Sequence, residues 1–100
     1  MLKIKIFQAL FFLFFLLFNE VVSSSQQLFI NNCSACHLGG TNIIIPEKNL
    51  KKETLDSNGL NSIPAISYQI RNGKNGMPAF GGRLTEEEIF QISSYIFYNY

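Results

Sequence analysis

An all-α fold of about four helices is predicted for this chain of 100 residues, a length that suits one small domain. Two segments repeat isoleucine at helical spacing, which is typical of a buried stripe on a helix. These are Ile63, Ile66, Ile70 and Ile89, Ile92, Ile96. Glycine-rich stretches separate the apolar segments. The β-branched run at 43–45 has no obvious pairing partner, so no sheet is expected.

The segment Cys33-Ser-Ala-Cys36-His37 is the motif around which the chain is organised. Cys-x-x-Cys-His is the attachment signature of a c-type haem. The two thiols bond the haem vinyl groups and the imidazole binds iron. At positions i, i+3 and i+4 these side chains share one face of a helical turn. We therefore expect one covalently bound haem c per chain, held by Cys33 and Cys36, with His37 as an axial iron ligand and the helices wrapped around it.

The cysteine pair alone also fits a disulfide, a thioredoxin-like redox pair or half of a zinc site. A structural zinc site needs about two further Cys or His ligands. The two cysteines and the single histidine of the chain all lie within the motif. A thioredoxin-like pair belongs to a strand–helix–strand unit, and no such pattern surrounds this one. These points favour the haem interpretation.

Residues 1–24 have the pattern of a secretory signal peptide. A start with two lysines is followed by an apolar run over 6–18 and by small residues at 23–25, where we expect cleavage. Residues 25–100 would then form a single mature domain. Export fits the cysteines, because their chemistry needs an extracytoplasmic compartment with its own thiol handling.

Retention of the leader as a membrane anchor is the alternative. The apolar run of thirteen residues is short of the roughly twenty that span a bilayer. Val21 and Val22 would lengthen it. We favour cleavage, so the mature form is expected not to be anchored in the membrane.

The charge and size of the mature chain narrow its function. The formal net charge is +1, and loss of Lys3, Lys5 and Glu20 with the leader leaves six basic and six acidic residues. This balance argues against a nucleic-acid partner. About seventy-five residues are marginal for a self-supporting core. A covalent haem at the centre of the core would compensate.

The first half of the domain is expected to surround the motif. Ser24 or Ser25 caps a helix that runs into the motif and ends at Gly39-Gly40. Phe29 on this helix faces either the haem or a partner helix. Residues 42–46 read as an apolar loop closing over the haem, because Pro46 disfavours helix at the residue before it. Residues 47–56 then form a short solvated helix with two inward leucines, Leu50 and Leu55.

Two amphipathic helices are expected in the second half. The turn Asn58-Gly59 precedes a helix that Asn61 or Ser62 caps and that Asn72-Gly73 ends. The last helix begins with a capping box, Thr85 with glutamate three residues on. Its isoleucine stripe is widened by Phe90 and Phe97. This helix should pack across the first one.

The glycine-rich loop 74–84 contains Met77, the only methionine besides the initiator. A lone methionine is usually core filler. Because His37 is the sole histidine, a closed haem site would need another sixth ligand, and a thioether is the available choice. We therefore expect Met77 to be the second axial ligand, with Lys74 as the weaker contender.

Three segments together resemble the cytochrome c6 family: Cys33-Ser-Ala-Cys-His-Leu-Gly-Gly40, Tyr68-Gln-Ile-Arg-Asn-Gly-Lys74 and Met77-Pro-Ala-Phe-Gly-Gly-Arg-Leu84. The likeness extends over about residues 26–100. It implies a class I cytochrome c fold, and it implies that Arg83 lies beside the exposed haem edge and helps to dock photosystem I. The chain departs from the family at Ser25, where a glycine is common, and at its C-terminus, which lacks the usual Trp and charged tail.

The resemblance implies a soluble electron carrier from the cytochrome b6f complex, through cytochrome f, to photosystem I. His/Met ligation leaves no open iron position, so we expect a one-electron shuttle and not an enzyme. The expected location is the thylakoid lumen of a plastid or cyanobacterium, and the expected state is a monomer or weak oligomer. A periplasmic cytochrome c feeding a terminal oxidase is the alternative. A haem sensor or peroxidase would follow if Met77 does not bind iron.

Overall fold

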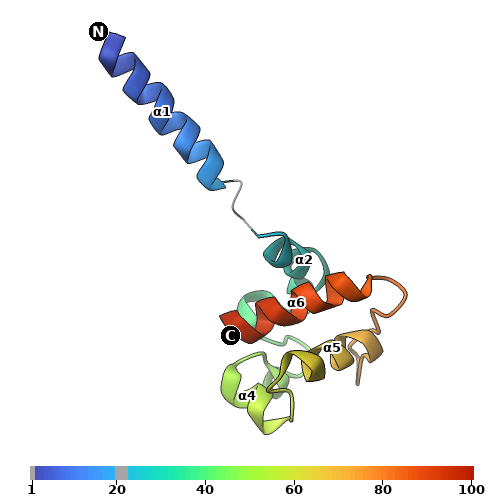
Figure 1. The fold of residues 1–100 in the computed structure, drawn as a ribbon. Helices are drawn as coiled ribbons and strands as arrows, with labels where there is room; N and C mark the ends of the chain where they lie inside the picture. The colour runs from blue at the N-terminus through green and yellow to red at the C-terminus, as the bar shows by residue number, and fades with distance from the viewer. Residues whose placement is uncertain (1, 20–22) are drawn as a thin grey trace.

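The computed structural model describes residues 2–19 and 23–100, and Figure 1 shows their helical architecture. In chain order the elements are α1 (Leu2–Asn19), α2 (Ser24–Asn32), α3 (Ser34–His37), the 3-10 turns η1 (Leu38–Gly40) and η2 (Pro46–Lys48), α4 (Lys52–Ser57), α5 (Ile63–Asn72) and α6 (Glu86–Asn99). Two isolated β-bridges are the only strand-like pairings in these ranges. The predicted all-α class is confirmed. The helix number exceeds four because α1 and the one-turn α3 add to it.

Helix α1 lies within residues 1–24, the predicted leader, and stands apart from the other helices in Figure 1. Its described apolar side chains, such as Phe7 and Phe11, are exposed. No helix in the described part of the chain is long and apolar enough to cross a membrane. Val21 and Val22, which would lengthen the apolar run, and Glu20 lie outside the described residues. Cleavage near 23–25 and the domain boundary at residue 25 stay predictions.

The first helix of the domain begins one residue earlier than expected. Ser23 is the N-cap of α2, and its Oγ accepts a hydrogen bond from the backbone N–H of Gln26 at 3.1 Å. Serine in the extended conformation is a strong N-cap wherever its hydroxyl reaches the third residue on. The helix also ends earlier, at Asn32, because Cys33 leaves helical geometry with φ −121°. The motif therefore forms its own turn, α3, directly after α2.

The last helix packs across the first, as predicted, and an aromatic cluster fills the crossing. The ring of Phe29 lies 5.2 Å from that of Tyr95 and 5.7 Å from that of Tyr100, measured between centroids. Phe29 is only 2% exposed. Of its two expected roles, Phe29 has the contact with a partner helix. Tyr100, the C-cap residue of α6, completes this cluster.

The single helix expected over 47–56 is wrong. The structure has η2 and α4 instead, separated by extended backbone at Asn49 with ψ 176°. The Asn49 side chain causes the break, because its Oδ1 accepts a hydrogen bond from the N–H of Lys51 at 3.0 Å. Asparagine competes in this way with helical hydrogen bonding. Leu55 is buried as expected, and Leu50 is partly buried against the core.

Helices α5 and α6 match their expected caps. Ser62 Oγ accepts from the N–H of Ala65 at 3.2 Å, and Gly73 ends α5 with φ 67°. Thr85 and Glu88 form both hydrogen bonds of the capping box of α6. These local signals depend on side chains three residues apart, which is why the sequence predicts them well.

The isoleucine stripes form much of the core. The buried apolar residues are Phe29, Cys33, Leu55, Ile66, Ile70, Phe80, Ile89, Ile92 and Ile96. Phe90 and Phe97 do not widen the stripe, since they are 52% and 41% exposed. The isoleucines already fill the side of α6 that packs on α2 and α5, so the phenylalanines remain on its flanks.

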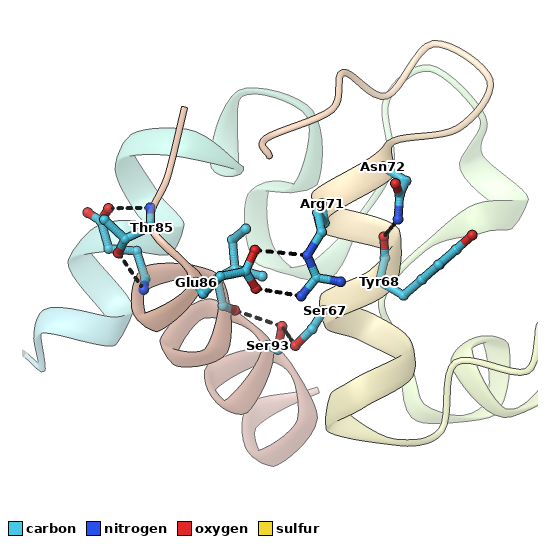
Figure 2. A network of polar contacts seen from close by, with 9 residues as sticks. Ser67, Tyr68, Arg71, Asn72, Thr85, Glu86 and Ser93 are labelled. Carbon is cyan, nitrogen blue, oxygen red and sulfur yellow. Dashed lines mark hydrogen bonds and ion pairs between the residues drawn. The ribbon is translucent and has the colours of Figure 1, made fainter. Parts of the chain in front are cut away.

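A polar contact lies inside the packed face between α5 and α6. Ser67 Oγ donates to Ser93 Oγ at 2.8 Å, and Ser93 Oγ donates to the carbonyl of Ile89 at 2.7 Å. Ser67 is 9% exposed and Ser93 is fully buried. Figure 2 shows this pair beside an ion pair of Arg71 and Glu86. No buried side-chain polar atom in the described residues lacks a partner.

Candidate haem-binding site

A cavity of about 280 Å³ lies between the motif, the 42–50 segment, α4, α5 and the loop that follows α5. Its walls include all four groups predicted to bind haem and iron: Cys33, Cys36, His37 and Met77. Much of the remaining wall is aliphatic or aromatic, from Ile44, Ile45, Leu50, Leu55, Leu60, Ile66, Ile70, Phe80 and Ile96. The fold therefore gathers residues from distant parts of the chain around one apolar space.

A backbone carbonyl orients the imidazole of His37. Nδ1 of His37 lies 2.8 Å from the carbonyl oxygen of Thr41. A carbonyl only accepts hydrogen bonds, so we assign the proton of the neutral ring to Nδ1. Nε2 then carries the lone pair that can bind a metal, and the hydrogen bond fixes the ring plane, as is usual for histidine ligands.

Both motif cysteines are free thiols in the structure, so they do not form the disulfide considered above. Burial, and to a lesser degree the neighbouring thiol of Cys36, raises the pKa of the Cys33 thiol to about 11. Cys33 is thus neutral at physiological pH, unlike the thiolates of redox or zinc sites. Among residues 2–19 and 23–100, no group of three or more His, Cys, Asp or Glu side chains is placed to hold a metal ion. The zinc interpretation therefore lacks its ligands there.

Met77 lies on a tight turn of the loop after α5. The N–H of Met77 donates to the carbonyl of Lys74 at 3.0 Å, and the N–H of Lys74 donates to the carbonyl of Met77 at 3.1 Å. The turn passes through left-handed backbone at Asn75 (φ 46°) and Gly76 (φ 88°). At Gly73, whose φ is also positive, a Cβ would overlap the carbonyl oxygen of Met77. The backbone of the turn, not a flexible loop, places the methionine at the cavity.

The segment 41–48, which we call the lid, has irregular backbone over 41–45 and the 3-10 turn η2 over 46–48, so the loop expected over 42–46 is confirmed up to Pro46. Asn42 organises it: its Oδ1 accepts from the N–H groups of Ile44 and Ile45 at 3.0 and 2.9 Å, and its Nδ2 donates to the carbonyl of Lys48 at 3.0 Å. A main-chain bond from Ile43 N–H to the carbonyl of Cys36 at 3.0 Å ties the segment to the motif, and a bond from Leu50 N–H to the carbonyl of Gly40 at 2.8 Å joins the residues on either side of it.

Asn42 is a positioning residue that the sequence analysis missed. An asparagine ahead of a β-branched run is a known turn signal, so the pattern itself could have indicated it.

Lys74 and Arg83, the two other residues predicted from the sequence, differ in their position relative to the cavity. Lys74, the weaker ligand contender, lines the cavity. Arg83 does not line it; it is exposed on the turn after Phe80, where its N–H donates to the Phe80 carbonyl at 3.0 Å. A role for Arg83 in docking stays a prediction.

The residues present fit a covalently bound haem. Two free thiols, an imidazole with a free Nε2 and a thioether share one apolar cavity, and a porphyrin needs just such surroundings. The group supplies a one-electron Fe(II)/Fe(III) couple when bound. The chain contributes the anchoring thiols, a fixed imidazole orientation and an apolar wall.

Comparison with known proteins agrees with this site. Residues 20–96 match the family model described as cytochrome c oxidase, cbb3-type, subunit III. Cytochrome c6 of Bumilleriopsis filiformis is 51% identical over 75 residues, which cover 75% of this chain and 87% of that protein.

Solved structures give the same picture. The crystal structure of cytochrome c6 from the diatom Phaeodactylum tricornutum is 49% identical with a TM-score of 0.71, and the match covers 73% of this chain and 86% of that one. OmcF, outer membrane cytochrome F of Geobacter sulfurreducens, is 32% identical with a TM-score of 0.71 over 74% of this chain and 95% of that one. The class I cytochrome c fold is thus confirmed. With half of its residues identical over three quarters of its length, the chain belongs to the cytochrome c6 family of electron-transfer proteins, which carry a covalently bound haem c and are not enzymes.

Proposed function

We propose that Cys33 and Cys36 bind one haem c through thioether bonds and that His37 and Met77 are its two axial iron ligands. The observation that carries this proposal is the cavity, on which these four side chains converge. The hydrogen bond from His37 Nδ1 to the Thr41 carbonyl supports it, because it leaves Nε2 available. Ligation from both sides leaves no position for a substrate, as expected for a carrier.

We propose further that the mature protein shuttles electrons from cytochrome f of the cytochrome b6f complex to photosystem I in the thylakoid lumen. The relatives that are half identical over most of their length carry the name cytochrome c6, and this supports the route. A shuttle must leave each partner quickly, so small and weakly bound interfaces are expected, with Arg83 at the one for photosystem I.

Delivery of electrons to a terminal oxidase is the second candidate. The matching family description names an oxidase subunit, and a similar solved structure, OmcF, is named an outer membrane cytochrome. Oxidation of the reduced protein by photosystem I particles and by oxidase membranes, compared at equal concentration, separates the two. Faster oxidation by the oxidase would overturn the photosynthetic route.

The leader is proposed to be removed, leaving 25–100 as an unanchored monomer or weak oligomer. The pattern of residues 1–24 supports cleavage. Intact mass of the protein from its native membrane fraction and supernatant tests it. A mass that retains α1 would mean a tethered cytochrome.

The first test of the whole proposal is an absorption spectrum. A low-spin spectrum of the reduced protein, together with a methionine-to-iron band at about 700 nm in the oxidised protein, would support covalent haem with a thioether ligand. A high-spin spectrum would mean that Met77 only fills the core, and the carrier function would then give way to a sensor or peroxidase.

A further inference from the structure

A bidentate ion pair joins the two helix ends between which the Met77 loop runs. Nε of Arg71 donates to Oε1 of Glu86 at 2.9 Å, and Nη2 donates to Oε2 at 2.6 Å. Arg71 lies in the last turn of α5 and Glu86 is the first residue of α6. Figure 2 shows the two side chains reaching across the seam between these helices. The pair therefore spans the base of the segment 73–85.

Arg71 also holds this segment through its backbone and its aliphatic stem. Its carbonyl accepts a hydrogen bond from the N–H of Gly81 at 3.0 Å, and the neighbouring carbonyl of Ile70 accepts from Phe80 at 3.0 Å. A Cβ at Gly81 would come within 3.1 Å of Arg71 Cγ and of its carbonyl oxygen. Residues 80–81 are thus attached to the end of α5, and Gly81 is held there by the same residue that binds α6.

Met77 lies in what remains of the loop, a short stretch with fixed ends. Its N-terminal end is closed by the paired hydrogen bonds of Lys74 and Met77. Its C-terminal end is fixed at residues 80–81. If the Arg71 side chain were released from Glu86, its stem would no longer be held against Gly81, and the two main-chain bonds alone would fix this end of the loop. The range of positions open to the Met77 sulfur would then widen.

Because both side chains of the pair are exposed, we expect the pair to restrain the nearby loop and to contribute little to the stability of the whole domain. The side chains of Arg71 and Glu86 are 38% and 69% exposed. Exposed ion pairs contribute little to overall stability. A bidentate arginine–carboxylate pair nevertheless fixes geometry strongly. Its effect should therefore be greatest on the loop that it brackets, not on unfolding of the whole domain.

We propose that Arg71 and Glu86 form a positioning clamp that keeps the Met77 thioether in the cavity against competing ligands. Neither residue lines the cavity, so both act through the loop. The inference rests on the proposed role of Met77 as an iron ligand.

The test is a titration of the oxidised holoprotein with imidazole, which binds iron only where the sixth ligand gives way. Arg71→Gln and Glu86→Gln should each bind imidazole about two- to five-fold more tightly than wild type, the range expected for losing an exposed ion pair. Glu87→Gln is the matched control, since it removes the same charge from the same helical turn. Within the described residues the Glu87 side chain forms a hydrogen bond with Gln91 alone, at 3.4 Å. It should match wild type.

The salt dependence of imidazole binding and the rate of amide hydrogen exchange give two further tests of the clamp. High salt should bring wild type towards Glu86→Gln and leave that variant unchanged, because salt screens the pair. Amide hydrogen exchange at Phe80 and Gly81 should be about two- to five-fold faster in both clamp variants, whatever ligand the iron has. The charge-swapped double variant, Arg71→Glu with Glu86→Arg, should restore both readouts towards wild type.

The outcomes distinguish the clamp from the ligand. If Glu86→Gln behaves like Glu87→Gln in imidazole affinity and in exchange, the clamp is wrong although Met77 binds iron. If wild type shows no methionine-to-iron band, the proposed ligand is wrong, and the exchange experiment alone then decides whether the pair restrains the loop.

Discussion

The ring of Tyr100 lies against Gly40, so close that a Cβ on the glycine would come within 2.7 Å of a ring carbon. The C-terminal residue thus covers the backbone three residues after His37. Tyr100 also packs against the rings of Phe29 and Tyr95, which lie against each other, so the three form one aromatic cluster at the crossing of α2 and α6.

Replacing Gly40 by alanine should destabilise the protein more than the same change at Gly39. Both glycines have positive φ, 83° and 63°, but a Cβ at Gly39 meets nothing within 4 Å. We expect a loss of about 1 kcal/mol for Gly39→Ala from backbone strain and about 1–3 kcal/mol more for Gly40→Ala from overlap. Denaturant unfolding of the holoprotein measures both. Tyr100→Ala should remove the extra loss, and equal losses at the two glycines would contradict the contact.

Alanine substitutions at the two buried serines between α5 and α6 should lower the stability of the protein by different amounts. Ser93→Ala leaves the Ser67 hydroxyl buried without its acceptor, at a cost of about 1–3 kcal/mol. Ser67→Ala costs less, since Ser93 keeps its bond to the Ile89 carbonyl. The double alanine variant should be more stable than Ser93→Ala alone. Thermal or denaturant unfolding of the three variants checks the order, and purely additive losses would count against a coupled pair.

Replacement of Met77 by alanine should abolish the methionine-to-iron band at about 700 nm and lower the reduction potential. Imidazole should bind the iron of this variant about tenfold more tightly, or better. The reason is loss of a soft ligand that favours Fe(II). Lys74→Ala is the control, and it should keep the band. If wild type lacked the band, and Lys74→Ala rather than Met77→Ala let imidazole bind more tightly, Lys74 would be the ligand.

Reversal of charge at Arg83 should slow reduction of photosystem I several-fold at low salt, with little change in potential. A charge at the rim of a transient interface acts mainly on the rate of encounter. Flash photolysis at increasing salt should show the two proteins converging. An unchanged rate at low salt would remove Arg83 from the docking surface.

The Arg71–Glu86 pair should make stability depend on pH in the acid range. The hydrogen bonds from Arg71 lower the pKa of the Glu86 carboxyl below its ordinary value. A group whose pKa is lowered by folding stabilises the protein fully above its unfolded pKa, about 4.3 for glutamate. This contribution is lost as the pH falls through the lowered folded value. The difference in unfolding midpoint between wild type and Glu86→Gln should therefore shrink from pH 6 to pH 3, and a constant difference would argue against the pair.

Local patterns explain what the sequence predicts well. Caps at Ser62 and Thr85, and the isoleucine spacing of α5 and α6, act over three or four residues, so they can be seen without the fold. The four groups on the cavity are also predictable, because the motif defines three of them and the chain offers a single other methionine.

The remainder depends on contacts between distant residues. Arg71 and Glu86 are fifteen positions apart on two helices, and Tyr100 meets Gly40 across the whole domain. Nothing in the local pattern of either residue indicates its partner. The break at Asn49 is a different failure, in which a side chain outcompetes helical hydrogen bonding that its neighbours favour.

The hydrogen bonds that fix the backbone of the lid do not depend on the isoleucine side chains that it carries. It is attached to the motif by the bond from Ile43 N–H to the Cys36 carbonyl and by the bond from the His37 ring to the Thr41 carbonyl. Its internal bonds come from the Asn42 side chain and from main-chain groups, so none of these bonds uses the side chains of Ile43, Ile44 or Ile45. These three positions can therefore change without releasing the segment. Two of them, Ile43 and Ile44, are largely exposed, and Ile44 and Ile45 line the cavity. Evolution can thus adjust the polarity at the mouth of the redox centre, residue by residue, on a backbone that stays in place.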